Sequence, residues 1–188
     1  GEVRSNEIEA LNRFLHLATR HCERIIRSEK KINTPFQFDE DVFIDHADII
    51  TSRFQQLQSI LGEKLLPSLL DQLGEQGSGY PFIDMFNRAI KLDIVNIEFP
   101  EWKSLRNERN RISHGEYDDL EFSEQKTIVV SFIEEDVATL KKLYIHIVEY
   151  ALNSPTIKKV ISEDNKHYIT SVIYPDEGNG GIQNAIKP

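Results

Sequence analysis

The stretch IEALNRFLHLATRHCERI (Ile8–Ile25) carries the pattern that decides the fold class. Its apolar residues recur alternately three and four positions apart, which places them on one face of an α-helix. That face consists of Ile8, Leu11, Leu15, Ala18, Cys22 and Ile25. Because Ser5 and Asn6 are both suitable N-caps just before it, the sequence predicts a long amphipathic helix at the start of the chain.

The same spacing returns after Pro35, a residue that bars helix at positions 33–35. Asp39 offers a new N-cap, and Glu40 and Asp41 are favourably placed in the first helical turn. The apolar face of this second predicted helix consists of Phe43, Ala47, Ile50, Phe54, Leu57 and Leu61. The two helices should therefore pack against each other through these faces.

Further helices follow along the chain. Residues 65–73 predict a short helix that ends in the linker GEQGSGYP (Gly74–Pro81), where three glycines and a proline break the pattern. Helices are also predicted at 82–92 and at 102–114, the latter stopped by Gly115. The longest helix should begin at Ser123 as N-cap and run to about residue 152. We therefore predict an all-α protein, an antiparallel up-and-down bundle.

The C-terminal part departs from this pattern. Two short apolar stretches, 156–161 and 167–174, flank SEDNK (Ser162–Lys166) and are compatible with a small β-hairpin, followed by a glycine-rich tail. The predicted organisation is a helical bundle at residues 1–152 and a C-terminal extension at residues 153–188.

Composition limits the classes of function. The chain has 188 residues, 39% of them hydrophobic, and carries 22 Lys and Arg against 31 Asp and Glu, a net charge of −9. This balance disfavours a protein that wraps duplex nucleic acid, although a local basic patch still allows contact with a few phosphates. The single cysteine, Cys22, excludes an intramolecular disulfide and fits a reducing compartment. No apolar run approaches the roughly 18–20 residues of a membrane span, so we expect a cytoplasmic protein without membrane contact.

One segment breaks the helical pattern: EWKSLRNERNRISHGEYDD (Glu101–Asp119). Its apolar face runs through Trp102, Leu105 and Ile112, and the position between the last two is occupied by Arg109. A permanent charge at such a position is costly unless it is paired or faces a solvated groove or interface.

The same segment holds the densest basic cluster beside a histidine: Lys103, Arg106, Arg109, Arg111 and His114. Arginine matches the oxygens of a phosphate, and histidine moves a hydroxyl proton at neutral pH, so this set suits phosphate chemistry. On residue types alone, a capped helix end whose basic residues balance the helix dipole explains the segment more simply.

Arg109 and Asn110, followed after three residues by His114, resemble the signature of the HEPN superfamily, an Arg followed after four to six residues by His with a polar residue directly after the Arg. The segments Arg53–Glu75 and Phe82–Leu92 and the long stretch 123–152 are similar in order to the helices of its HepT-like branch. The resemblance covers about residues 6–152.

The resemblance implies a metal-independent endoribonuclease of a toxin–antitoxin or phage-defence system, without a cofactor. It implies a homodimer in which two copies of the motif form one cleft that binds RNA. His114 would move the proton of the ribose 2′-OH or of the leaving 5′-oxygen, Arg109 would stabilise the phosphorane, and Asn110 would orient the phosphate or the histidine. The products would be a 2′,3′-cyclic phosphate and a 5′-OH.

Three further basic residues, Lys103, Arg106 and Arg111, are candidates for substrate binding. Many HepT-like toxins carry a tyrosine two residues after the histidine, which a partner nucleotidyltransferase antitoxin modifies with AMP. Here Tyr117 stands three residues after His114, so it is a candidate modification site and equally a packing residue.

Two alternatives remain open from the sequence. The first is a non-catalytic HEPN-like adaptor that binds a nucleotidyltransferase partner, a nucleotide or RNA, which the acidity and the shifted tyrosine favour. The second is a site for a divalent metal ion in the acidic group around His46, which is formed by Asp39, Glu40, Asp41, Asp45 and Asp48. We interpret it as a helix N-terminus and a solvated face, and we predict no metal site.

Overall fold

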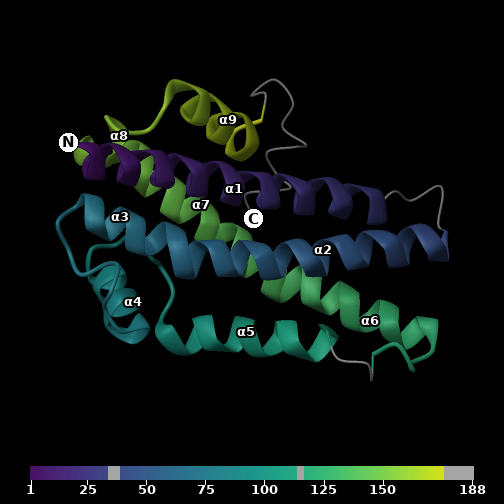
Figure 1. Cartoon of the computed structure of the whole chain (residues 1–188). Helices are drawn as coiled ribbons and strands as arrows, with labels where there is room; N and C mark the ends of the chain where they lie inside the picture. Colours follow the sequence, from purple (N-terminus) through teal and green to yellow (C-terminus); the bar gives the residue numbers. More distant parts are fainter. Residues whose placement is uncertain (34–38, 114–116, 176–188) are drawn as a thin grey trace.

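The computed structural model describes residues 1–33, 39–113 and 117–175 and, for residues 108–113, the backbone alone. All regular structure in these ranges is helical, which confirms the all-α prediction. Helix α1 (Glu2–Ile32) is followed by α2 (Glu40–Ile60), which returns alongside it (Figure 1). The N-cap expected at Ser5 or Asn6 is wrong, because α1 already begins at Glu2 and the Ser5 N–H donates to the Gly1 carbonyl within the first turn. The Asp39 side chain accepts hydrogen bonds from the backbone N–H groups of Asp41 and Val42 at 2.8 and 3.3 Å, which confirms this N-cap.

Helix α2 does not stop where the sequence suggested. It continues through one π-helical turn, η1 (Leu61–Leu65), into α3 (Leu66–Gln72). The separate short helix predicted at 65–73 is therefore the end of one continuous run, because Pro67 lies at the start of α3, where its missing N–H is tolerated. After the glycine-containing linker come α4 (Phe82–Lys91) and α5 (Phe99–Ser113).

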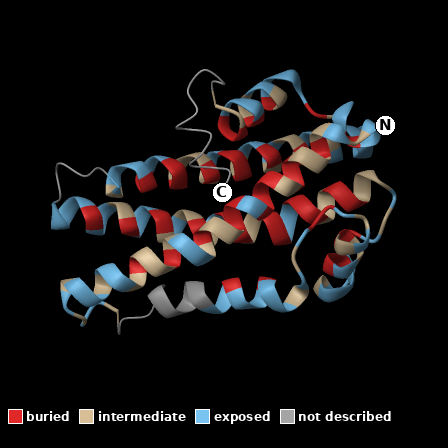
Figure 2. Cartoon of the chain, turned by 180° about the vertical axis from the view of Figure 1, so that it is seen from behind, coloured by how far each residue is buried: buried red, intermediate tan, exposed pale blue. Residues whose placement is uncertain are grey.

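A second continuous run consists of α6 (Phe122–Phe132), the π-helical turn η2 (Ile133–Val137) and α7 (Ala138–Asn153). It crosses the α1–α2 pair on the face turned toward the viewer in Figure 2. The predicted N-cap Ser123 is wrong, because the helix already begins at Phe122 and Ser123 lies in its first turn, where its carbonyl accepts from the Thr127 hydroxyl at 3.0 Å.

The core lies between these two runs and α1, where the buried faces of the helices meet (Figure 2). The apolar faces predicted for α1 and α2 are buried from end to end, except that Ile8 is half-buried. Phe54 of α2 packs edge-to-face on Phe132 of α6, with ring centroids 4.8 Å apart. The buried Tyr144 hydroxyl donates to Thr19 Oγ1 at 2.8 Å, so the core satisfies this polar group internally.

The β-hairpin considered for residues 156–174 is wrong. The chain there forms α8 (Pro155–Lys158) and α9 (Glu163–Ile173). The reason is that SEDNK is a helix start rather than a turn: Ser162 Oγ accepts from the Asn165 backbone N–H at 3.2 Å, and acids occupy the first turn. The buried residues Asn165, Ile169, Val172 and Ile173 then follow helical spacing.

Helix α9 is tied to the first helix. Asn165 Nδ2 donates to the carbonyl and to Oδ1 of Asn12 at 2.8 and 3.0 Å, and Asn12 Oδ1 also accepts from the Ser162 N–H at 2.8 Å. Ile169 and Ile173, both fully buried, belong to the same apolar core as α1. The predicted glycine-rich tail, residues 176–188, lies outside the described residues.

Candidate functional site

Helix α5, which carries the basic segment, lies along α2 (Figure 1). Trp102 and Leu105, two members of its predicted apolar face, are only 5% and 4% exposed. Gln58 Nε2 on α2 donates to the Trp102 carbonyl at 3.4 Å, so a buried side chain holds the two helices in register. The first half of α5 is thus a docked helix with one face turned outward, through Lys103, Ser104 and Asn107.

The predicted catalytic residues lie at the far end of this helix. Arg109, Asn110 and Arg111 have helical backbone within the last two turns of α5, but their side chains lie outside the description. His114 lies outside the described residues altogether. That Arg109 and His114 come together in one catalytic cleft therefore stays a prediction.

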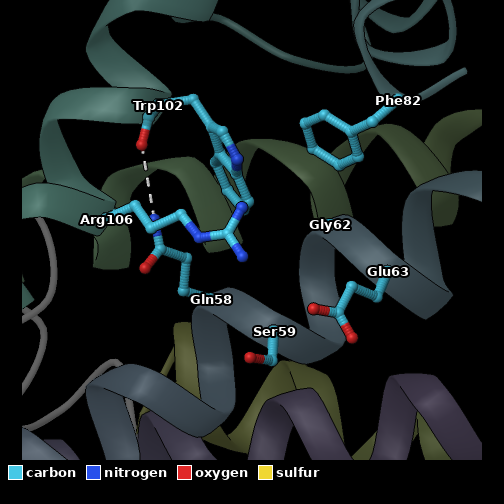
Figure 3. Close-up of a pocket in the computed structure, with 7 residues that line it drawn as sticks. All are labelled: Gln58, Ser59, Gly62, Glu63, Phe82, Trp102 and Arg106. Carbon is cyan, nitrogen blue, oxygen red and sulfur yellow. Dashed lines mark hydrogen bonds between the residues drawn. The ribbon is translucent and has the colours of Figure 1, made fainter.

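A pocket of about 190 Å³ opens beside the first half of α5, between α2, η1 and α4 (Figure 3). It is called here the Trp102 pocket, and it is lined by Gln58, Ser59, Gly62, Glu63, Phe82, Trp102 and Arg106. Phe82 and Trp102 form its aromatic wall, with ring centroids 6.0 Å apart. A Cβ added at Gly62 would lie 2.6 Å from Trp102 Cζ2, so only glycine lets the indole pack this closely.

Three polar groups of the Trp102 pocket have no hydrogen-bond partner within the part of the chain that the structure describes. Arg106 and Glu63 are both exposed, and within the described residues neither makes a hydrogen bond or an ion pair. Gln58 is 2% exposed, and its Oε1 is buried without a partner in the described part of the chain. Because a carbonyl accepts only, the amide end that meets the Trp102 carbonyl must be Nε2, which leaves Oε1 as an unused acceptor. Buried polar atoms without partners are rare in folded proteins and call for an explanation.

Of the substrate-binding candidates, Arg106 lines the pocket and Lys103 does not. The Lys103 ammonium lies 5.8 Å from the centroid of the Phe99 ring, a cation–π contact on the surface of the same helix. The π-helical turn η1 supplies Gly62 and Glu63 to the pocket, and such turns often occur at functional sites.

Tyr117 lies beside the first half of α2, away from the Trp102 pocket. It is half-buried against the small apolar cluster of Phe43, Ala47 and Val129. A second, acidic pocket there is lined by Ala47, Asp48, Thr51, Ser52, Gln55, Tyr117 and Asp118. Burial raises the pKa of the Tyr117 hydroxyl, and the nearby carboxylates raise it further. Burial and the neighbouring acids Asp118 and Asp45 likewise raise the pKa of Asp48.

The two pockets are joined by a polar face of α2 and η1 that the sequence analysis missed. It contains Asp48, Ser52, Gln55, Ser59 and Glu63, which recur three and four positions apart. The same spacing rule that identified the apolar face identifies this polar face, provided that polar residues are read for periodicity as well.

Other groups considered from the sequence have structural partners. His46 Nδ1 lies 3.1 Å from Ser28 Oγ, and in the described ranges no three His, Cys, Asp or Glu side chains are grouped as metal ligands would be. Burial raises the pKa of the Cys22 thiol to about 12, which makes it unreactive. Over residues 1–33, 39–113 and 117–175, no helix combines the length and the apolar character needed to cross a bilayer.

Comparison of the chain with protein-family models, with curated proteins and with solved structures returned no match.

Proposed function

We propose that this protein is a metal-independent endoribonuclease of the HEPN type that acts in the cytoplasm as part of a toxin–antitoxin or phage-defence system. The observation that supports it best is the position of the RNxxxH segment. Arg109 and Asn110 lie on α5 one turn after Arg106, a cation that lines an open pocket and has no ion-pair partner among the described residues. The segment therefore follows, on the same helix, a cation that can bind a phosphodiester.

The reaction requires one proton transfer at each end of the scissile bond. His114 removes the proton of the ribose 2′-OH or delivers one to the leaving 5′-oxygen, as the 2′-oxygen attacks phosphorus and the P–O5′ bond breaks. Arg109 stabilises the charge of the phosphorane, and Asn110 orients the phosphate or the imidazole. No metal and no cofactor takes part in this scheme.

The proposed enzyme is a two-fold homodimer, an antiparallel HEPN-like bundle in each subunit. The outward face of α5 supports this assembly, since Ser104 and Asn107 are exposed while Trp102 and Leu105 hold the helix to α2. Arg109 occupies an otherwise apolar position, where an isologous interface would let two copies share solvent and substrate phosphate.

The test is RNA cleavage in the presence of EDTA by the purified protein and by His114→Ala and Arg109→Ala. We expect losses of about 10²–10⁴-fold for the histidine and about 10²–10³-fold for the arginine, with 2′,3′-cyclic phosphate ends in the residual product. His167→Ala and Arg13→Ala are matched controls, because both residues are exposed and lie on other helices. Equal cleavage by all variants, or none by any, contradicts the proposal.

A non-catalytic adaptor is the second candidate function. The acidic pocket beside Tyr117 favours it, since Asp48 and Asp118 repel RNA in a chain of net charge −9. An adaptor would bind a nucleotidyltransferase through this face without cutting RNA. Expression of wild-type protein and of His114→Ala would separate the two candidates. Toxicity that is lost in His114→Ala supports the nuclease, because an adaptor does not require this histidine.

A further inference from the structure

We propose that the Trp102 pocket binds one guanine base of a single-stranded RNA. The inference rests on the proposed function only for the origin of the base, because the base-binding site itself is argued from the residues of the pocket. A volume of about 190 Å³ is smaller than the roughly 300–1,000 Å³ of pockets for drug-sized molecules, so the pocket suits a single base.

The wall of the pocket suits a flat aromatic ligand. Phe82 and Trp102 both present aromatic rings to the pocket, and Gly62 lets the indole pack directly against η1 (Figure 3). Unstacked bases of single-stranded RNA commonly stack on aromatic side chains and on arginine guanidinium planes. Arg106 is in place to supply such a plane beside the indole.

The polar groups select among the bases. The Glu63 carboxylate, an acceptor, and the Arg106 guanidinium, a donor, both line the pocket and have no hydrogen-bond partner in the described ranges. Guanine presents the complementary edges, since N1–H and the N2 amine donate while O6 and N7 accept. Adenine in the same orientation would direct its N1 lone pair at the Glu63 carboxylate, and uracil has no amine to donate.

The lack of an ion pair between Arg106 and Glu63 fits this assignment. Both charges line one small pocket, yet neither pairs with the other or with any described residue. A ligand that donates on one edge and accepts on the other satisfies both charges at once. Arg106 precedes Arg109 by three residues of described helix, about 4.5 Å along the axis, so the bound base would belong to a nucleotide next to the scissile phosphate.

The experiment uses Trp102 as reporter, because it is the only tryptophan of the chain. GMP, AMP, CMP and UMP are titrated into the full-length His114→Ala protein while its fluorescence is followed. We expect saturable quenching by GMP with at least tenfold tighter binding than AMP, as one bidentate contact provides. Glu63→Gln should reduce the preference to less than about threefold, and the exposed control Glu124→Gln on α6 should leave it unchanged. Equal quenching by GMP and AMP, or no saturation up to about 1 mM, overturns the site.

A second arm separates RNA from free nucleotide and from the nuclease proposal. Oligouridylates that contain one guanosine or one adenosine replace the mononucleotides. Tighter binding of the guanosine oligomer supports the proposal, whereas binding of GMP alone overturns the assignment to RNA. Guanine binding by a wild-type protein that cuts no RNA contradicts the proposed function alone, and RNA cleavage without any guanine preference contradicts this inference alone.

Discussion

Two pairs of opposite charges in this protein are used in opposite ways. Glu29 of α1 and Lys141 of α7 are 8% and 6% exposed, and Lys141 Nζ lies 2.7 Å from Glu29 Oε2. Glu63 and Arg106 line one pocket at the surface and do not pair. A charged side chain in the dry core requires a counter-charge within the fold, because burial removes its hydration. A charged side chain at the surface is hydrated by water and can therefore bind a ligand instead.

The largest expected effect breaks the buried pair. Lys141→Met leaves the Glu29 carboxylate buried without its counter-charge, and we expect a loss of about 3–5 kcal/mol in the free energy of unfolding, measured by urea denaturation. Lys142→Met is the matched control, because Lys142 follows Lys141 directly in the chain but is exposed. The double variant Glu29→Leu with Lys141→Met should recover most of the loss. A loss below about 1 kcal/mol in Lys141→Met would show that the core does not depend on the pair.

A smaller effect is expected where the pocket meets the core. Gly62→Ala adds a methyl group that meets the Trp102 indole, and overpacking of this kind costs about 1–3 kcal/mol. Thermal unfolding gives the stability, and a shift of the tryptophan emission reports the displaced ring. Ser59→Ala, in the same pocket, serves as control. An unchanged Tm with unchanged emission would mean that the close glycine–indole contact does not constrain this region.

A third prediction concerns pH and lies outside both charge pairs. Arg53 Nη1 donates to His21 Nδ1 at 3.0 Å, and burial, followed by the charges of Arg53 and Arg20, lowers the pKa of His21 to about 4. The unfolded chain takes up this proton near pH 6.5 while the folded chain does not, so stability falls as the pH falls from 6.5 toward 4.

We expect a loss of about 1 kcal/mol between pH 7 and pH 5 from this histidine, after discounting for its partial exposure. His21→Gln should remove that part of the pH dependence of urea unfolding, while His167→Gln on the surface of α9 should leave it in place. The same slope in wild type and His21→Gln would contradict the assignment.

The smallest effect on stability is expected for the two exposed charges of the Trp102 pocket. Glu63→Gln and Arg106→Ala should change the free energy of unfolding by less than about 0.5 kcal/mol, because both side chains are exposed and unpaired in the described structure. The measurement is urea denaturation alongside Lys141→Met. A loss above 1 kcal/mol in either variant would assign these charges to the scaffold instead of to a ligand.

The sequence predicted some elements well and others poorly for identifiable reasons. The apolar faces of α1 and α2 and the Asp39 cap depend on neighbours within a few residues, and they are confirmed. The hairpin at 156–174 was wrong because short apolar stretches are ambiguous between strand and helix. The break expected at 65 was wrong because a π-turn continues the helix through Leu61–Leu65, which no local spacing rule anticipates.

One part of the candidate site could be predicted from the sequence and the other could not. The basic segment on α5 was recognisable from residue types and spacing, and its catalytic geometry stays a prediction. The Trp102 pocket was not recognisable, because Glu63, Phe82 and Arg106 come from three separate segments of the chain. Periodicity shows which face of a helix is apolar, but it does not show which other helix covers that face.

The sequence by itself determined that this protein is helical, that its second helix begins after Asp39, and where its basic segment lies. These properties depend on spacing and capping, which act over a few residues. The tertiary structure alone decided that Glu29 meets Lys141, that Asn12 binds Asn165, and that Gly62 accommodates Trp102. The physical reason is that these contacts join segments far apart in the chain, whose pairing is selected by the packing of whole helix faces rather than by any local preference.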